Sequence, residues 1–135
     1  MSGGARGNLL WACALLLLCS AGAHALLGWP PIARDLQAAA VSADLIAGLR
    51  MGWYFGSAAM LAFAAITGLA AYNLKRGLSV PLGGLGVIGW TYLIFGLAAF
   101  VYRDFNSHFL AFMAQGALLL AAAGPGWRPN RRRAA

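Results

Sequence analysis

The chain has 135 residues, of which 61% are apolar and 10% are charged, and its formal net charge is +7. This composition is too hydrophobic for a soluble domain, and four stretches approach the roughly 20 residues that a helix needs to cross a bilayer. The connections between these stretches are too short to fold independently. We therefore predict one membrane domain covering 1–135, an all-α, up-down bundle of four transmembrane helices. The predicted spans cover about 9–28, 43–72, 80–101 and 107–123.

The basic residues are distributed unevenly, and their positions predict the topology. Seven of the ten lie before the first span, between the second and third, or after the fourth: Arg6, Lys75, Arg76, Arg128, Arg131, Arg132 and Arg133. The positive-inside rule places these regions, and therefore both termini, in the cytoplasm. Because topology accounts for the positive charge, the expected partner is the lipid bilayer and not nucleic acid. A composition rich in alanine and arginine, with almost no lysine, favours a bacterial inner (plasma) membrane.

The first span is expected to end where Trp29, an interfacial aromatic residue, precedes two helix-stopping prolines, Pro30 and Pro31. The following stretch, 32–41, has a helix-forming composition and one charged turn. It is predicted to form a short amphipathic helix at the outer interface. Ser42 is the expected N-cap of the second span.

Residues 1–25 also fit a cleaved secretory signal. A basic residue precedes an apolar segment, and Ala23-His24-Ala25 matches the small residues of a cleavage site. The apolar run continues beyond this point to full spanning length, which favours an uncleaved anchor. Cys13 and Cys19 belong to the same span and lie on different helix faces. We therefore expect both to pack as small apolar residues and to form no disulfide with each other.

The second span carries an arginine inside its apolar sequence. Counted from Ser42, Arg50 lies about 12 Å along the helix axis, below the headgroups. An unpaired arginine at this depth costs at least about 2.5 kcal/mol on insertion scales, so Arg50 is expected to find polar partners or to extend to the interface. The residues expected to share its broad helix face are Trp53, Tyr54, Ser57, Leu61, Ala64 and Gly68.

Another face of the second span repeats glycine at every fourth position, at Gly48, Gly52 and Gly56. This small-xxx-small pattern lets a second helix approach closely, and it predicts contact with a membrane-protein partner or a second copy of the chain. The glycines at 83–89, at the start of the third span, are interpreted as a similar groove. A phosphate-binding loop is excluded there, because the motif lies inside an apolar span.

The fourth span has expected boundaries at both ends. Asn106 or Ser107 is predicted to cap its beginning, and Gly124 with the following Pro125 is predicted to end it. Trp127 is expected to anchor the inner interface.

The predicted topology gathers polar residues from all four spans in the outer half of the membrane. We expect Asp104 or His108 to transfer a proton, and Arg50 to bind an anionic or carbonyl oxygen of the substrate. The candidate catalytic residues are His24, Arg50, Asp104 and His108, and the candidate ligand-binding residues are Trp53, Tyr54, Ser57, Tyr102 and Gln115.

We interpret this constellation first as a binding site for a lipophilic ligand or a partner subunit. The alternative is a membrane-embedded enzyme acting by acid/base chemistry on an isoprenoid, quinone or lipid-like substrate. Haem ligation by His24 and His108 and small-molecule transport are weaker hypotheses, because two histidines are a weak signal and the aspartates lie near span ends. A structural alternative pairs Arg50 with Asp44 or Asp104. No metal site or cofactor is expected.

Overall fold

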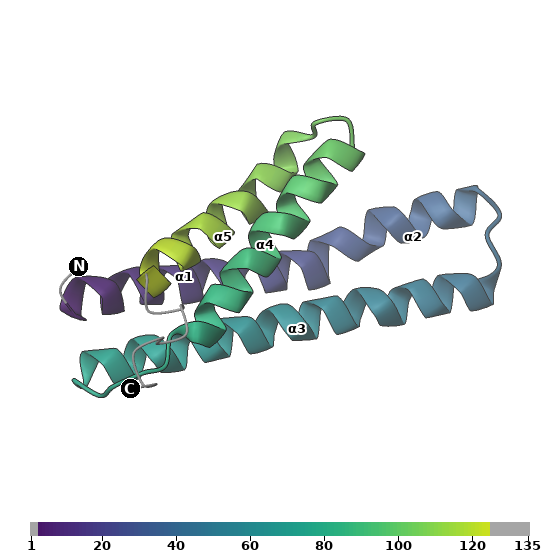
Figure 1. The fold of residues 1–135 in the computed structure, drawn as a ribbon. Helices are drawn as coiled ribbons and strands as arrows, with labels where there is room; N and C mark the ends of the chain where they lie inside the picture. Colours follow the sequence, from purple (N-terminus) through teal and green to yellow (C-terminus); the bar gives the residue numbers. More distant parts are fainter. Residues whose placement is uncertain (1–2, 125–135) are drawn as a thin grey trace, which may run out of the picture.

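The computed structural model describes residues 3–124, and each element of secondary structure in this range is helical (Figure 1). The predicted all-α class with four main helices is therefore confirmed. The elements in chain order are α1 (Gly3–Ala23), the π-helical η1 (His24–Gly28), α2 (Trp29–Ala38), α3 (Ala43–Lys75), α4 (Gly83–Tyr102), the 3₁₀-helical η2 (Ser107–Phe109) and α5 (Leu110–Ala123). Pro125, Trp127, Arg128 and Arg131–Arg133 lie outside the described residues.

The first three elements form one continuous helix of 36 residues, Gly3–Ala38. The expectation that Pro30 and Pro31 stop this helix is wrong. The wider π-helical turn of η1 comes directly before α2, so the prolines occupy the first positions of a new α-helical segment. A proline is tolerated there because its missing N–H is one that the first turn of a helix does not use. The helix ends instead at a turn in which Ala40 adopts a φ of 55°.

The second long helix, α3, contains 33 residues and begins as the sequence predicts. The Ser42 side chain accepts a hydrogen bond from the backbone N–H of Leu45, at 3.4 Å, and so caps the first turn. Asp44 lies in that turn, where its negative charge interacts favourably with the positive end of the helix dipole. At the other end of the fold, α5 stops at Gly124, which adopts a φ of 61°, as predicted for a glycine that ends a helix.

Three of the helical stretches are long and apolar enough to cross a membrane: Gly3–Ala38, Ala43–Lys75 and Gly83–Tyr102. The fourth, Ser107–Ala123, is a shorter apolar helix. At 1.5 Å per residue the first two are roughly 50 Å long, well beyond a hydrocarbon core of about 30 Å. A hydrophobic helix longer than the hydrocarbon core can cross it in a tilted orientation.

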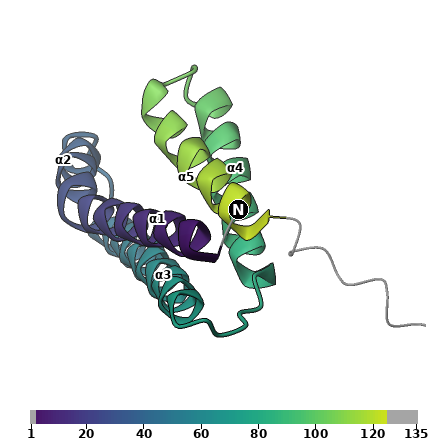
Figure 2. The same cartoon turned by 90° about the vertical axis from the view of Figure 1, so that its left-hand side faces the viewer.

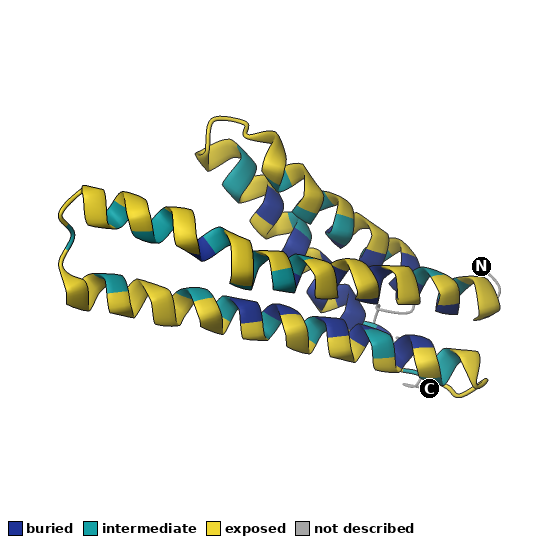
Figure 3. Ribbon diagram, turned by 180° about the vertical axis from the view of Figure 1, so that it is seen from behind, coloured by how far each residue is buried: buried dark blue, intermediate teal, exposed yellow. Residues whose placement is uncertain are grey.

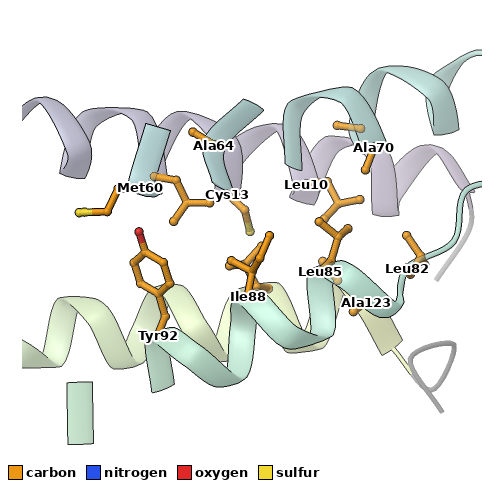
Figure 4. Packing of buried hydrophobic residues seen from close by; sticks show 14 of the residues in the cluster. Leu10, Cys13, Met60, Ala64, Ala70, Leu82, Leu85, Ile88, Tyr92 and Ala123 are labelled. Carbon is orange, nitrogen blue, oxygen red and sulfur yellow. The ribbon is translucent and has the colours of Figure 1, made fainter. Parts of the chain in front are cut away.

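The helices pair as two hairpins (Figure 2). The continuous α1–η1–α2 helix runs beside α3, and α4 runs beside α5. The second hairpin contacts the first through α1 and α3, whereas η1 and α2 make no contact with α4, η2 or α5. The buried residues gather where the hairpins meet, and the α2–α3 end is largely exposed (Figure 3). The buried apolar cluster at this junction includes Leu10, Cys13, Leu17, Ala64, Ala71, Leu85, Ile88 and Leu119, some of which Figure 4 labels.

The hairpin of α4 and α5 is held by closely approaching glycines. A Cβ atom added at Gly116 would lie 2.6 Å from the carbonyl oxygen of Gly89 and 2.6 Å from the backbone nitrogen of Leu93. A Cβ atom at Gly96 would lie 2.8 Å from the backbone nitrogen of Met113. Such contact between backbones is the usual way in which helices associate in lipid.

The glycine ridge predicted on α3 is not used in the same way. Nothing lies within 4 Å of a Cβ atom added at Gly48 or Gly52, and the position at Gly56 makes only ordinary contact with the His24 ring, at 3.8 Å. Within residues 3–124, therefore, the first two glycines of the ridge pack against no other helix.

Candidate functional site

The first polar cluster joins η1 to the middle of α3. The His24 Nδ1 atom lies 2.9 Å from the hydroxyl oxygen of Ser57. The His24 ring stacks on Trp53, with ring centroids 3.9 Å apart and an interplanar angle of 6°. In return, the Trp53 indole N–H donates to the backbone carbonyl oxygen of His24, at 2.8 Å. Three of the predicted site residues are thus in direct contact.

The hydrogen bonds of this cluster connect the imidazole to the backbone of α3. The Ser57 hydroxyl donates to the carbonyl oxygen of Trp53, at 3.2 Å. A neutral His24 with its proton on Nδ1 is compatible with both contacts, because Nδ1 then donates to the Ser57 oxygen. Within the described residues, Nε2 forms no hydrogen bond. Ser57 itself is 4% exposed, and its hydroxyl contacts the His24 ring and the Trp53 carbonyl oxygen.

The local sequence explains why the cluster forms at η1. A Cβ atom at Gly28 would lie 2.5 Å from the Trp53 ring, so a glycine is needed for the indole to lie flat against this turn. The ring of Trp29, the residue after Gly28, also lies near the Trp53 ring, with ring centroids 6.3 Å apart. The π-helical turn, a feature often found at functional sites, aims the His24 ring and carbonyl group at α3.

The second polar feature is a cavity between the end of α2 and the start of α3, with a volume of about 530 Å³. Arg50 supplies its positive charge, and the guanidinium carbon lies 5.7 Å from the centroid of the Tyr54 ring. Within residues 3–124, Arg50 forms no ion pair with Asp44 or Asp104. The residues that line the cavity are Gln37, Ala43, Ile46, Ala47, Arg50, Met51 and Tyr54.

The depth of this cavity follows from the length of α3. Ala59 is the midpoint of Ala43–Lys75, and Arg50 precedes it by nine residues. That separation is about 13.5 Å along the helix, close to the half-thickness of about 15 Å of a hydrocarbon core. The guanidinium group therefore lies at the boundary between acyl chains and headgroups when α3 is centred in the bilayer.

The helix face predicted around Arg50 divides into two parts. The buried stripe of α3 contains Ser57, Met60, Ala64 and Thr67 and faces the other helices. Its centre lies near Trp53, about 60° around the helix from Arg50 at 3.6 residues per turn. Arg50 and Tyr54 are exposed at the margin of this stripe. This angular offset around α3 separates Arg50 from the His24 cluster.

The remaining predicted site residues belong to the second hairpin. The Gln115 side-chain N–H donates to the hydroxyl oxygen of Ser20 on α1, at 2.6 Å. Tyr102 is 86% exposed, and Asp104 lies in the α4–η2 turn with a φ of 52°. His108 is exposed and contacts the rings of Phe109 and Phe112 edge-on.

The structure thus brings together parts of the predicted constellation and not the whole. His24, Trp53 and Ser57 form one cluster, and Arg50 lies beside Tyr54 in a separate cavity. Asp104 and His108 lie at the tip of the α4–α5 hairpin, on elements that make no contact with η1 or α2. His24 and His108 accordingly do not face one another across the bundle. In residues 3–124, no group of three or more His, Cys, Asp or Glu side chains could hold a metal ion.

Sequence reasoning missed Gln37 as a wall of the cavity and Ser20 and Tyr92 as polar groups of the interior. Gln37 lies on the predicted amphipathic stretch, so only the continuation of the first helix through the prolines reveals its neighbours. Ser20 and Tyr92 lie near the centres of their helices, a position at which polar side chains are uncommon. Scanning each span for polar residues at its centre would have found both.

Comparison with protein-family models, curated proteins and solved structures finds no match for this chain.

Proposed function

We propose that this chain is a small integral membrane protein of the bacterial inner membrane that binds a lipophilic molecule carrying an anionic headgroup. The observation that carries the proposal is the arginine-containing cavity between α2 and α3. In the proposed topology both termini are cytoplasmic, so the cavity opens near the outer interface. Carboxylate or phosphate groups are the anionic headgroups that a guanidinium recognises.

The charge of Arg50 supports an anionic ligand. A guanidinium group at the edge of the hydrocarbon core loses much of its hydration, and the described residues supply no acidic partner to replace it. A bound anion provides that partner through charge-assisted hydrogen bonds, each worth about 1.5–3 kcal/mol. The amide of Gln37, which also lines the cavity, adds a neutral donor beside the guanidinium.

The other walls support a lipophilic body. Ile46 and Met51 line the cavity with apolar side chains, and Ala43 and Ala47 keep its α3 wall smooth. The site is open, because Ile46 is half-buried and the other lining residues are exposed, so a bound chain lies against the surface of α3. The ligand headgroup is accordingly placed at Arg50, and its chain extends along α3 toward the bilayer.

A partner helix is the second candidate occupant of this end of the molecule. The free space at Gly48 and Gly52 favours it, because a helix can approach α3 closely there. In that arrangement a second copy or another membrane protein covers the glycine ridge. The acid/base alternative has less support, since His24, Arg50, Asp104 and His108 lie at three separate places.

The test uses two photoreactive probes with the same diazirine-bearing acyl chain. One is a fatty acid with a free carboxylate, and the other is its neutral methyl ester. The protein is reconstituted in lipid nanodiscs, and the cross-linked residues are mapped by mass spectrometry. We expect the carboxylate probe to label the segment from Gln37 to Tyr54 about ten-fold more than the ester, the ratio for one charge-assisted hydrogen bond.

Matched variants decide whether Arg50 is responsible. Arg50→Met is expected to lower carboxylate labelling to the level of the ester. Arg103→Met, which removes an exposed arginine at the tip of the other hairpin, is expected to leave it unchanged. Equal labelling of wild type and Arg50→Met contradicts the proposal. Cross-links between two copies near Gly48 and Gly52, together with no labelling of this segment by the probe, favour the partner-helix alternative instead.

A further inference from the structure

Each of the four helical stretches carries a polar side chain at its centre. Ser20, Ser57, Tyr92 and Gln115 are each within two residues of the midpoint of their stretch, and Thr91 lies beside Tyr92. When the helices cross a bilayer, these midpoints lie near its central plane, where a polar group has no water to bind. Polar side chains at such a position need hydrogen-bond partners from other helices or from a bound molecule.

Contacts between the helices connect three of these groups, Ser20, Tyr92 and Gln115, to the junction of the hairpins. Gln115 of α5 donates to Ser20 of α1, at 2.6 Å. The Tyr92 ring of α4 packs on Phe63 of α3, with centroids 6.3 Å apart, and on Phe112 of α5, at 5.9 Å. Phe112 lies one helical turn from Gln115, on the same side of α5. All four main helices therefore meet around Tyr92 and Gln115.

Two polar atoms at this level have no partner. The Tyr92 hydroxyl is buried without a hydrogen bond, and Tyr92 as a whole is 4% exposed. Figure 4 shows the hydroxyl directed toward Met60 of α3. The Gln115 Oε1 atom is also buried without a hydrogen bond, while its amide N–H is engaged by Ser20. Buried polar groups are almost always satisfied in native proteins, so two orphans at one level indicate a missing partner.

The chemistry of the orphans specifies that partner. The Tyr92 hydroxyl can donate a hydrogen bond, and Gln115 Oε1 can only accept one. A hydroxyl group can accept from the first and donate to the second. Asp35, Asp44 and Asp104 all lie toward the ends of their helices, so this level has no acid to balance a cation. The surrounding side chains of Met60, Phe63 and Phe112 are apolar and suit a lipophilic body.

We infer that Tyr92 and Gln115 form a second binding site, at the junction of the two hairpins, for the hydroxyl group of a neutral lipophilic alcohol or phenol. This site is separate from the Arg50 cavity and does not depend on it. Both orphan atoms are buried, so entry of a ligand requires the α4–α5 hairpin to move away from α1. The absence of contacts between η1 or α2 and the second hairpin leaves that movement unopposed on one side of the junction.

The experiment uses a long-chain primary alcohol with a diazirine in its chain and, as a matched probe, its methyl ether. The ether accepts hydrogen bonds and cannot donate one to Gln115. In nanodiscs, we expect the alcohol to label the peptides containing Met60, Tyr92 and Gln115 about five-fold more than the ether, the ratio for one net hydrogen bond. An excess of unlabelled alcohol is expected to abolish the difference.

Variants connect the preference to the two residues. Tyr92→Phe and Gln115→Leu are each expected to bring alcohol labelling down to the ether level. Thr91→Val is the control, because Thr91 is the exposed neighbour of Tyr92 and its hydroxyl already bonds to the Val87 carbonyl oxygen at 3.0 Å. Tyr92→Phe retains the ring and its packing, so a folded variant is expected, and its helical circular dichroism verifies this.

Two outcomes overturn the inference: equal labelling by the alcohol and the ether, or a preference that survives in Tyr92→Phe. The first is also the result expected when an ordered water alone bridges the two orphans. Arg50→Met separates this site from the proposed function, because it is expected to leave alcohol labelling intact. Tyr92→Phe is likewise expected to leave carboxylate labelling of the α2–α3 cavity unchanged.

Discussion

The contact between the two helices of a hairpin differs from one hairpin to the other. Between α4 and α5, three glycines let the backbones touch, and no polar side chain bridges the pair near Gly89 or Gly116. Between the first helix and α3, the interface at η1 consists of a stacked histidine and tryptophan with two side-chain hydrogen bonds. In lipid, close packing and hydrogen bonding are the two available sources of helix association. The first hairpin adds the polar contact at η1 to the apolar packing of α1 on α3, whereas the second relies on close packing.

The largest effect is expected at the glycine interface. Gly116→Val places side-chain atoms against the backbones of Gly89 and Leu93, which cannot move aside as a flexible side chain would. Overpacking of this kind costs about 3 kcal/mol of the free energy of unfolding. The measurement is denaturant-induced unfolding in mixed micelles, followed by circular dichroism. Gly84→Ala is the control, because nothing lies within 4 Å of its Cβ position, and an equal loss there would contradict the account.

A smaller effect is expected at the polar interface. Trp53→Phe keeps an aromatic ring against His24 and removes the indole N–H that bonds to the His24 carbonyl oxygen. Hydrogen bonds between helices in membranes are worth about 0.6–1.7 kcal/mol, so we expect a loss of about 1 kcal/mol in the same unfolding assay. Trp90→Phe, which alters an exposed tryptophan of α4, is expected to change the free energy of unfolding by less than half as much.

At the junction of the hairpins the expected sign is reversed. In detergent without added alcohol, Tyr92→Phe removes a buried hydroxyl that has no partner, and the free energy of unfolding is expected to rise by about 1 kcal/mol. Tyr102→Phe removes an exposed hydroxyl and is expected to have no effect. A loss of stability in Tyr92→Phe would mean that the hydroxyl is already satisfied in the unliganded protein.

The smallest effect is expected on the open ridge of α3. Gly52→Ala introduces a methyl group where no atom lies within 4 Å, and alanine is the better helix former by up to about 1 kcal/mol. We expect a gain of about 0.5 kcal/mol in the monomer. Cross-linking in nanodiscs checks whether self-association changes: a marked decrease would show that a second copy packs on the ridge.

The sequence predicts the helices better than it predicts their arrangement. Hydrophobic length and Ser42 locate the second span, and the glycine at 124 marks the end of the last helix, because these signals are local. Pro30 and Pro31 gave the wrong helix end, since the sequence shows neither the π-helical turn that precedes them nor its contact with Trp53 of α3.

The candidate site was predictable only in part for a related reason. Periodicity places Arg50 and Ser57 on one broad face, but the rotation of α3 against its neighbours decides that Ser57 is buried and Arg50 is not. The predicted topology puts His24 and His108 in the same half of the membrane. The packing of the second hairpin at the junction keeps its tip out of contact with η1. Helix rotation and hairpin divergence arise from packing between distant residues, which a single sequence does not display.

Native mass spectrometry of the protein extracted from its membrane in mild detergent identifies any molecule bound in the α2–α3 cavity. We expect a wild-type chain carrying a releasable anionic amphiphile. The adduct is expected to be lost from Arg50→Met and retained by Arg103→Met. An adduct that persists in Arg50→Met, or a wild-type chain that releases only neutral molecules, contradicts the assignment of the α2–α3 cavity as an anion-binding lipophilic site.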